Sequence, residues 1–204
     1  MYAQGHRPEV VIRSELLGIT AVAAGAQQIS STLDISKYQY ITLFIDHARD
    51  EAAAFVGAGT EYKIQVSEKA SGSDTWRTLT SAVCDITAAS DIIMDGNEAA
   101  GQTIIETGAT LPAVNDIVFF KNATIANSEW VRVTEIDNTG GTEHFHISDG
   151  LTNAQAQLAH IYNKAEQFVI SLTNTAYTRL RVVVNNANGS TNKAIVCRVA
   201  VITR

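Results

Sequence analysis

The chain has 204 residues, of which 46% are hydrophobic and 18% charged, and its formal net charge is −6. A chain of this length buries about 70% of the surface that it exposes when unfolded, so it can fold as one large domain or two small ones without metals or disulfides. The acidic balance and the lack of a Lys/Arg cluster exclude the positive surface with which proteins grip phosphates, so no direct nucleic-acid partner is expected.

The start of the chain lacks the marks of a secretory signal. Residues 1–10, MYAQGHRPEV, contain no basic stretch followed by an apolar one, and no later segment has the eighteen or so continuous apolar residues of a membrane span. We therefore expect synthesis in the cytoplasm and no membrane partner. Cys84 and Cys197 are too few for a disulfide framework. Cys197 is expected to be a small buried hydrophobe, with a bridge to Cys84 as the alternative.

Alternation of apolar and polar residues predicts strands in the first part of the chain, at 9–17, 38–46 and 61–67. In the third of these, Tyr62, Ile64 and Val66 share one face, which is the pattern of a half-buried strand. The segment 38–46, YQYITLFID, differs because it is apolar on both faces. Its aliphatic face and its aromatic face carry, respectively, Ile41, Leu43 and Ile45, and Tyr38, Tyr40 and Phe44.

A strand that is apolar on both faces is expected to be covered on both sides. Segment 38–46 is therefore predicted to be a central strand that lies beneath another layer or forms a subunit contact. Tyr38, Tyr40 and Phe44 are accordingly candidate interface residues. Together with the low charged fraction, this pattern predicts a homo-oligomer, most simply a trimer.

The middle of the chain, from 98 to 165, carries its own set of short elements. Strands are predicted at 103–106, 116–121, 128–135 and 144–147, and a short helix at 151–161, where apolar residues recur at helical spacing. After residue 166 the clean alternation returns, with strands predicted at 167–172, 177–185 and 193–203. The inward faces of these last strands are expected to carry Phe168, Ile170 and Leu172, then Leu180, Val182 and Val184, then Ile195, Cys197, Val199 and Val201.

Many short strands separated by turns rich in Gly, Asn, Asp and Ser predict an all-β fold. We expect an antiparallel β-sandwich, jelly-roll-like, with an inserted small β-rich domain. The sandwich comprises 1–97 and 166–204, and the insert comprises 98–165. Insertions of this kind are tolerated at exposed loop tips.

No motif in the sequence predicts catalysis, a cofactor or a metal site. His144 and His146 share one face of a predicted strand, with Glu143 and Asp149 nearby, but a structural metal site needs four ligands at recognisable spacing. Clustered carboxylates at 46–51 and 137–143 do not match a calcium loop and are read as solvated loop charges. The glycine-rich nucleotide loops and the GxSxG hydrolase motif are missing from the sequence. No row of aromatic residues suggests a sugar-binding surface, so the aromatic residues are assigned to core or interface packing.

Three stretches of the predicted sandwich carry a resemblance. They are 35–45 (ISKYQYITLFI), 62–69 (YKIQVSEK) with 74–79 (DTWRTL), and 177–185 (YTRLRVVVN) continuing to Val201. Their sequence of strand, polar turn, Trp and closing hairpin resembles jelly-roll or sandwich structural proteins of tailed-bacteriophage virions, especially capsid decoration (cement) proteins.

The resemblance implies a non-enzymatic protein at the capsid surface of a virion. Such a protein binds the outside of the assembled capsid and bridges subunits of the major capsid protein, which stiffens the head. Residues 1–8 are then the candidate arm that docks on a neighbour, with Tyr2, His6 and Arg7 as candidate interface residues. The alternative is a phage tail, fibre or receptor-binding component whose insert recognises a carbohydrate or a protein. A depolymerase is the third and least favoured alternative.

Overall fold

The computed structural model describes residues 12–50, 57–71, 76–84, 90–108, 110–138, 143–174, 176–188 and 194–204. Its strands are β1 (Ile12–Val22), β2 (Gln27–Ile29), β3 (Leu33–Asp34), β4 (Tyr40–Arg49), β5 (Gly57–Ser67), β6 (Arg77–Val83), β7 (Asp91–Ile93), β8 (Ile104–Thr107), β9 (Ile117–Lys121), β10 (Glu129–Asp137), β11 (Glu143–Ile147), β12 (His160–Tyr162), β13 (Glu166–Thr173), β14 (Arg179–Asn188) and β15 (Ile195–Thr203). The one helical element in the described ranges is a 3-10 turn, η1 (Ile125–Asn127). Within those ranges, no helix has the length and hydropathy needed to cross a membrane.

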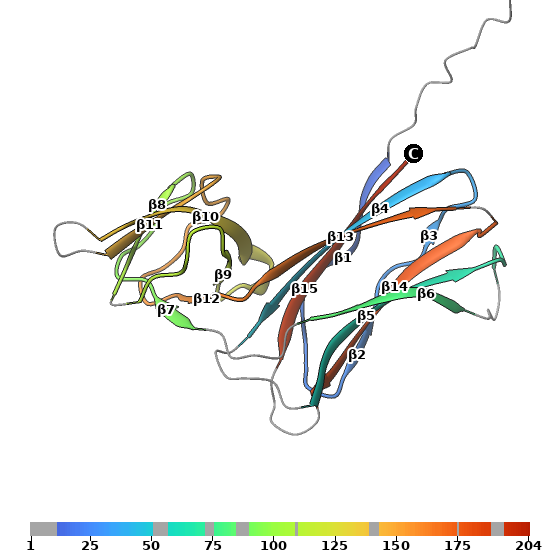
Figure 1. Ribbon diagram of the computed structural model, residues 1–204, viewed down its shortest axis with the longest axis horizontal. Coiled ribbons are helices and arrows are strands. Elements are labelled where there is room, and N and C mark those ends of the chain that lie inside the picture. Colours follow the sequence, from blue (N-terminus) through green and yellow to red (C-terminus); the bar gives the residue numbers. More distant parts are fainter. Residues whose placement is uncertain are drawn as a thin grey trace, which may run out of the picture.

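The strands form three antiparallel sheets in two lobes (Figure 1). In the sandwich lobe, a four-stranded sheet of order β1-β15-β4-β13 lies against a five-stranded sheet of order β2-β14-β5-β6, with β3 also paired to β14. The six-stranded lobe is a single sheet of order β7-β12-β9-β10-β11-β8. This arrangement confirms the prediction of an all-β, antiparallel sandwich fold.

The chain winds between the two sheets of the sandwich at nearly every connection. The two-residue β3 pairs with β14 in the same sheet as β2 and is left out of the count. With β1, β2, β4, β5, β6, β13, β14 and β15 counted as first to eighth, the sheet orders are 1-8-3-6 and 2-7-4-5. Only the hairpin from β5 to β6 stays within one sheet. This winding is that of a jelly roll, and the six-stranded lobe is inserted between its fifth and sixth strands.

The sandwich core follows directly from the alternation in the sequence. Every inward residue predicted for the strands at 61–67, 177–185 and 193–203 is buried in one apolar cluster with Leu16, Val22, Ile35 and the aliphatic face of β4. Phe168, Ile170 and Leu172 of β13 pack against this cluster but are only partly buried. The predicted inward faces are thus confirmed, and the inner face of β13 is only partly covered.

The six-stranded lobe has its own apolar core and a narrow neck. Its buried cluster includes Phe120, Phe145 and Ile161, and contains no residue of the sandwich core. At the neck the Ser90 N–H donates to the side-chain oxygen of Asn163 over 2.6 Å, so the chain enters and leaves the lobe at one point. The sheet begins at β7, ahead of the predicted boundary at 98, because β7 pairs with β12 rather than with a strand of the sandwich. Independent folding of the two parts stays a prediction.

The short helix predicted at 151–161 is wrong. Its backbone instead pairs with the segment before β8: the N–H groups of Leu151, Gln155 and Leu158 donate to the carbonyls of Gln102, Glu98 and Met94. Leu158 has a φ of 65° and its side chain is 67% exposed. The helical spacing of apolar residues was a coincidence of two buried ends, Leu151 and Ile161, around an irregular stretch.

Replacing residues 91–162 with a short Gly/Ser linker should leave a sandwich that still unfolds cooperatively. No residue of the sandwich core comes from that segment, and the hydrogen bond between Ser90 and Asn163 shows that a few residues span the gap. Urea unfolding followed by circular dichroism checks this, with the full chain as the control. A deletion variant without a cooperative transition would show that the sandwich depends on the lobe for folding.

Candidate functional site

The outer face of the four-stranded sheet changes from exposed to buried along β4. Tyr40 is 53% exposed, Thr42 and Phe44 are half-buried, and Asp46 and Ala48 are buried. The opposite face of the same strand is buried in the sandwich core throughout. The prediction of a central strand beneath another layer is therefore met at one end of β4, while the other end stays open.

The covered end of β4 carries the apolar contact between the lobes. Ala48 and Val196 of the sandwich are buried with Phe119, Tyr162 and Ala165 in one cluster. The Trp130 side chain of β10 packs against it, with its ring centroid 4.8 Å from that of Phe119. Its indole N–H donates to the carbonyl of His47 on β4 over 3.0 Å. Trp130 thus fixes the six-stranded lobe to the backbone of the sandwich.

A buried carboxylate marks the middle of the outer face. Asp46 is 3% exposed, and it accepts hydrogen bonds from Arg198 Nε over 2.7 Å and from Gln167 Nε2 over 2.9 Å. A buried charge is costly unless it is paired, so these two bonds hold Arg198 and Gln167 in place. A further ion pair, Lys121 Nζ to Asp50 Oδ1 over 2.7 Å, joins the lobes.

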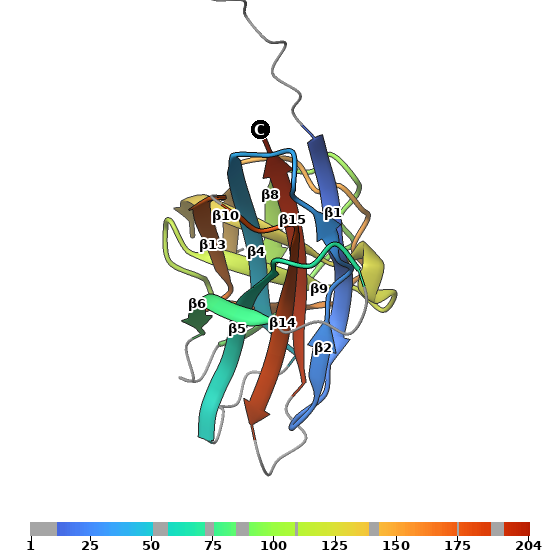
Figure 2. The ribbon, with the colours of Figure 1, turned by 90° about the vertical axis from the view of Figure 1, so that its right-hand side faces the viewer.

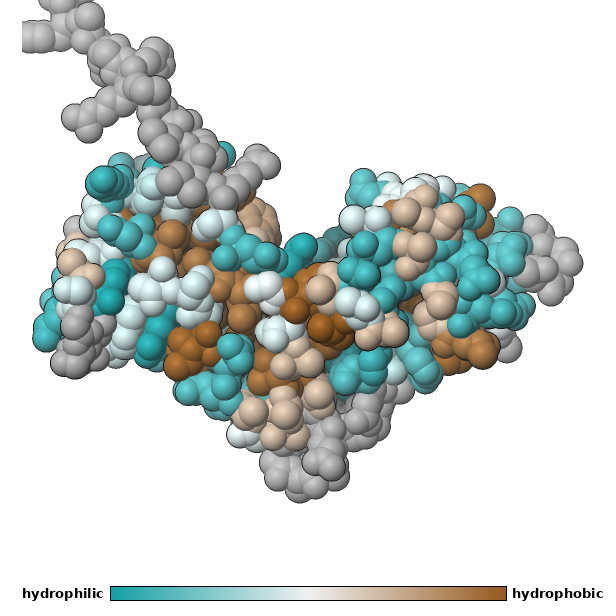
Figure 3. All heavy atoms as spheres, turned by 180° about the vertical axis from the view of Figure 1, so that it is seen from behind, coloured by the Kyte–Doolittle hydropathy of each residue, from teal (hydrophilic) through white to brown (hydrophobic). Residues whose placement is uncertain are grey.

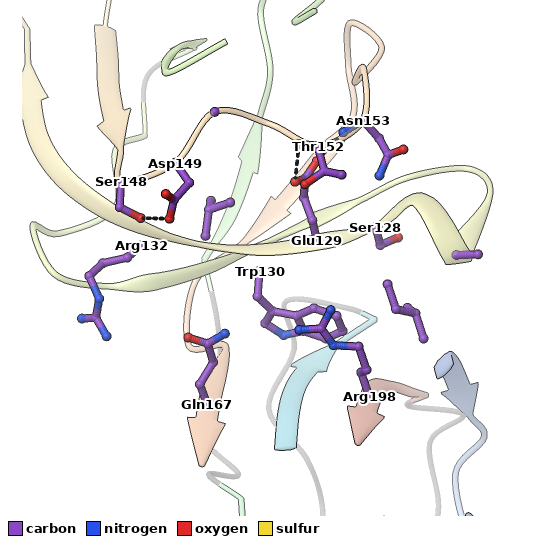
Figure 4. A pocket seen from close by; sticks show the side chains of 14 residues that line it. Ser128, Glu129, Trp130, Arg132, Ser148, Asp149, Thr152, Asn153, Gln167 and Arg198 are labelled. Atoms are coloured by element: carbon purple, nitrogen blue, oxygen red, sulfur yellow. Dashed lines mark hydrogen bonds between the residues drawn. The ribbon is translucent and has the colours of Figure 1, made fainter. Parts of the chain in front are cut away.

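A polar crevice of about 620 Å³ lies between the lobes (Figure 4). β10 and the loop after β11 supply one wall, while Ile19, Gln167 and Arg198 supply the other. Its carboxylate Glu129 accepts hydrogen bonds from the backbone N–H groups of Thr152 and Asn153 and from Gln155. Glu129, Gln167 and Arg198 are held by hydrogen bonds within the chain. We therefore interpret the crevice as the polar rim of the contact between the lobes.

The uncovered end of the sheet presents what we call the open face, made of Tyr40, Thr42, Phe44, Val169 and Ile202. Four of these residues line a shallow hollow of about 420 Å³ together with Arg204. Val169, opposite Phe44 on β13, is 63% exposed. On the side of the molecule seen in Figure 3, hydrophobic side chains gather over the sandwich and where the lobes meet, and hydrophilic ones cover most of the six-stranded lobe. A cluster of exposed apolar side chains is typical of an interaction surface.

The structure brings together two of the six predicted interface residues. Tyr40 and Phe44 lie together on the open face. Tyr38 precedes β4, is half-buried, and lines a separate small hollow with Asn174 and Tyr177. Tyr2, His6 and Arg7 lie outside the described residues. Val169 and Ile202 were missed in the sequence, because only strand pairing brings them beside Phe44 and Tyr40.

Buried polar groups gather inside the sandwich at the covered end of β4. His47 Nδ1 and the Tyr62 hydroxyl form a hydrogen bond of 2.8 Å, and both residues are buried. Burial, and then the charge of Arg49, lower the pKa of His47 to about 3, so His47 is neutral near neutral pH. Burial raises the pKa of Tyr62 well above its ordinary value. The bond satisfies His47 Nδ1 and the Tyr62 hydroxyl, whereas His47 Nε2 has no hydrogen-bond partner among the described residues. Because both side chains are buried, neither offers a proton donor or acceptor to solvent.

The two thiols are inert. Cys84 and Cys197 are both free and buried, so the alternative of a bridge between them is not supported. Burial raises the pKa of Cys197 to about 12 and raises that of Cys84 further. Because the thiolate is the nucleophile, neither side chain is activated for chemistry.

His144 and His146 lie on the outward face of β11, as predicted. Strand register places His144 between Glu106 and Asp137 and places His146 beside Glu135. His144 Nε2 lies 3.9 Å from Glu106 Oε1. Within the described ranges, no group of three or more His, Cys, Asp or Glu side chains is placed so that it could hold a metal ion.

Comparisons with known proteins were made at the level of sequence and of structure. No family model matches the sequence, and no curated protein matches it. Among solved structures, the chain matches VP17, a capsid protein of bacteriophage P23-77, with 12% identity and a TM-score of 0.22, over 95% of this chain and 94% of that one. A TM-score this low carries no argument about fold or function.

Lowering the pH from about 7 to about 4 should destabilise the protein in part through His47. Its pKa is about 3 when folded and near 6.5 when unfolded, so within this window the unfolded chain binds the proton and the folded chain does not. The contribution of His47 to the free energy of unfolding is therefore complete above the unfolded pKa and falls by about 1.4 kcal/mol per pH unit below it.

The His47→Gln variant keeps a hydrogen-bonding partner for Tyr62 but lacks the titrating group, so its free energy of unfolding should fall less steeply. Urea titrations at several pH values measure both slopes, and subtracting one from the other removes the contribution of carboxylates common to both proteins. Equal slopes would contradict the assignment.

Proposed function

We propose that the protein is a virion structural protein that decorates a bacteriophage capsid, binding its outer surface and bridging subunits of the major capsid protein. The observation that carries the proposal is the open face, where Tyr40, Phe44, Val169 and Ile202 leave apolar surface exposed on a rigid sheet. Exposed apolar surface on a rigid scaffold favours a protein partner.

The chemistry of the described residues supports a role in which no bond is made or broken. His47, Cys84 and Cys197 are buried and un-ionised near neutral pH. The charged side chains of the crevice are held by neighbours within the chain. On a lattice, many copies of a modest contact act together, so affinity does not require a deep pocket.

A second candidate is a tail, fibre or receptor-binding component. The observation that favours it is the six-stranded lobe, which projects from the sandwich with its own core (Figure 1). In that case the lobe would carry the recognition of a carbohydrate or a protein. The two candidates place the protein at different ends of the particle.

Immunogold labelling of purified virions with an antibody against this protein tests the proposal. Decoration predicts gold particles spread over the head, because a cement protein binds every repeat of the lattice. Particles confined to the tail would establish the second candidate, and unlabelled virions would contradict both. Virions that lack this protein serve as the control for antibody specificity.

Replacing Tyr40 and Phe44 together by Ser should weaken binding to capsids at least tenfold and change the free energy of unfolding little. Burying two aromatic side chains contributes several kcal/mol to an interface, and about 1.4 kcal/mol corresponds to a factor of ten. The matched control is Leu79→Ser with Val83→Ser on β6, whose side chains are 41% and 59% exposed on the other sheet. Co-sedimentation with capsids measures binding, and equal binding by both double variants would refute the role of the open face.

A further inference from the structure

The outer edge of β13 is a pairing surface that no described strand occupies. β13 is the last strand of the four-stranded sheet, and its partner in that sheet is β4. Figure 2 shows β13 and β6 at one edge of the sandwich and β1 and β2 at the other. A free edge presents a row of backbone N–H and C=O groups that can pair with another strand.

The other long edges of the sandwich carry features that discourage pairing. β1 has two register shifts against β15 and an exposed Glu15. β6 has a register shift against β5 and begins at the charged Arg77. Irregularities and edge charges of this kind are the usual protection against edge-to-edge association.

β13 lacks this protection. Its eight residues, EQFVISLT, pair with β4 without a register shift and contain no Lys, Arg or Pro. Its one charged residue is Glu166, at its first position. β13 is therefore a regular, nearly uncharged edge of the length that a partner strand can follow.

Half of the backbone groups of β13 face this open edge. The Asn174 N–H donates to the Gln39 carbonyl on the β4 side, and the direction of these groups alternates along a strand. Even-numbered residues of β13 thus bond to β4, and Gln167, Val169, Ser171 and Thr173 direct their N–H and C=O groups outward. The pairing of Tyr40 with Arg204 on the other side of β4 gives the same alternation.

The side chains of β13 also lack cover. Phe168, Ile170 and Leu172 face the sandwich core but are only partly buried. Val169, on the outer face, is 63% exposed. One further strand would cover both faces at once.

We propose that the occupant is β13 of a second copy, which makes an antiparallel two-fold dimer through this edge. If the core-facing side chains of both copies lie on the same face of the joined sheet, the two β13 strands can pair in either of two registers near their centre. Centring on Val169 would set Glu166 opposite the second copy's Leu172 on the inner face, which is unfavourable. Centring on Ile170 sets Ile170 opposite its own copy and Phe168 opposite the second copy's Leu172, so the apolar core continues from one copy to the next.

The outer face is equally compatible with the register centred on Ile170. There Val169 lies opposite the second copy's Ser171, and Gln167 lies opposite the second copy's Thr173. No like charges oppose each other. Two sheets of order β1-β15-β4-β13 become one continuous sheet, and this inference does not depend on binding to a capsid.

Analytical ultracentrifugation of the full chain without capsids tests the dimer. The wild type should sediment as a concentration-dependent dimer. Val169→Lys should weaken self-association at least tenfold, because it places a charge on an edge that must pair and sets two like charges diagonally across the strand pair. Val83→Lys is the matched control, since Val83 is 59% exposed on β6 at the edge of the other sheet, and it should remain dimeric. A wild type that stays monomeric at its highest soluble concentration, or equal effects of the two lysines, would overturn the proposal.

Cysteine cross-linking tests the register. Ile170 directs its backbone groups toward β4, so across the dimer it forms a non-hydrogen-bonded pair, in which side chains lie closest. Ile170→Cys should therefore form a covalent dimer under mild oxidation, while Val169→Cys forms far less. The native Cys84 and Cys197 are buried and supply the background in the wild type. Efficient cross-linking of Val169→Cys but not of Ile170→Cys would refute the proposed register.

Discussion

The contact that Trp130 makes with the end of β4 determines the shape of the whole molecule. At this end of β4 the outer face of the sheet carries the apolar side chains of Ala48 and Val196, which would be exposed to solvent without cover. Trp130 and Phe119 bury Ala48 and Val196, and the indole N–H bonds to the backbone of His47, so the lobe is held by shape and by one directed bond. Because the lobe covers only this end, the remainder of the face, around Tyr40 and Phe44, stays available to other molecules.

The winding of the sandwich explains why an insertion at this position is tolerated. The lobe leaves the chain between β6 and β13, which lie at the same edge of the sandwich but in different sheets. A connection there must already cross from one sheet to the other, and the hydrogen bond between Ser90 and Asn163 closes the neck. Every residue of the sandwich core lies outside the insertion. The core is built mainly from strands far apart in sequence, as in β1 with β15, which makes it depend on the two ends of the chain rather than on its middle.

The sequence identified the elements whose side chains alternate and missed those that pairing alone defines. All ten predicted strands are present, and the inward faces of β5, β14 and β15 are as predicted. β2, β3, β7 and β12 are two or three residues long, which is too short to show an alternation of apolar and polar residues. β6 was missed because most of its side chains are exposed, so its sequence is mainly polar. Tyr40 and Phe44 were identifiable as candidates because they repeat on one strand. Val169 and Ile202 were not, since their proximity to Phe44 and Tyr40 is created by strands 120 or more residues away in the chain.

The open edge and the open face belong to the same sheet, and this has a geometric consequence for assembly. Antiparallel pairing through β13 places the two-fold axis perpendicular to the sheet, so both copies direct their open faces to the same side. Two modest apolar contacts on one side of a rigid unit bind a repeating surface more strongly than either contact alone. An edge strand pairs only once, so association through β13 ends at two copies. The trimer expected from the sequence would have to use a surface other than this edge. If that surface were the open face, Tyr40 and Phe44 would be buried between copies and unable to contact a different protein.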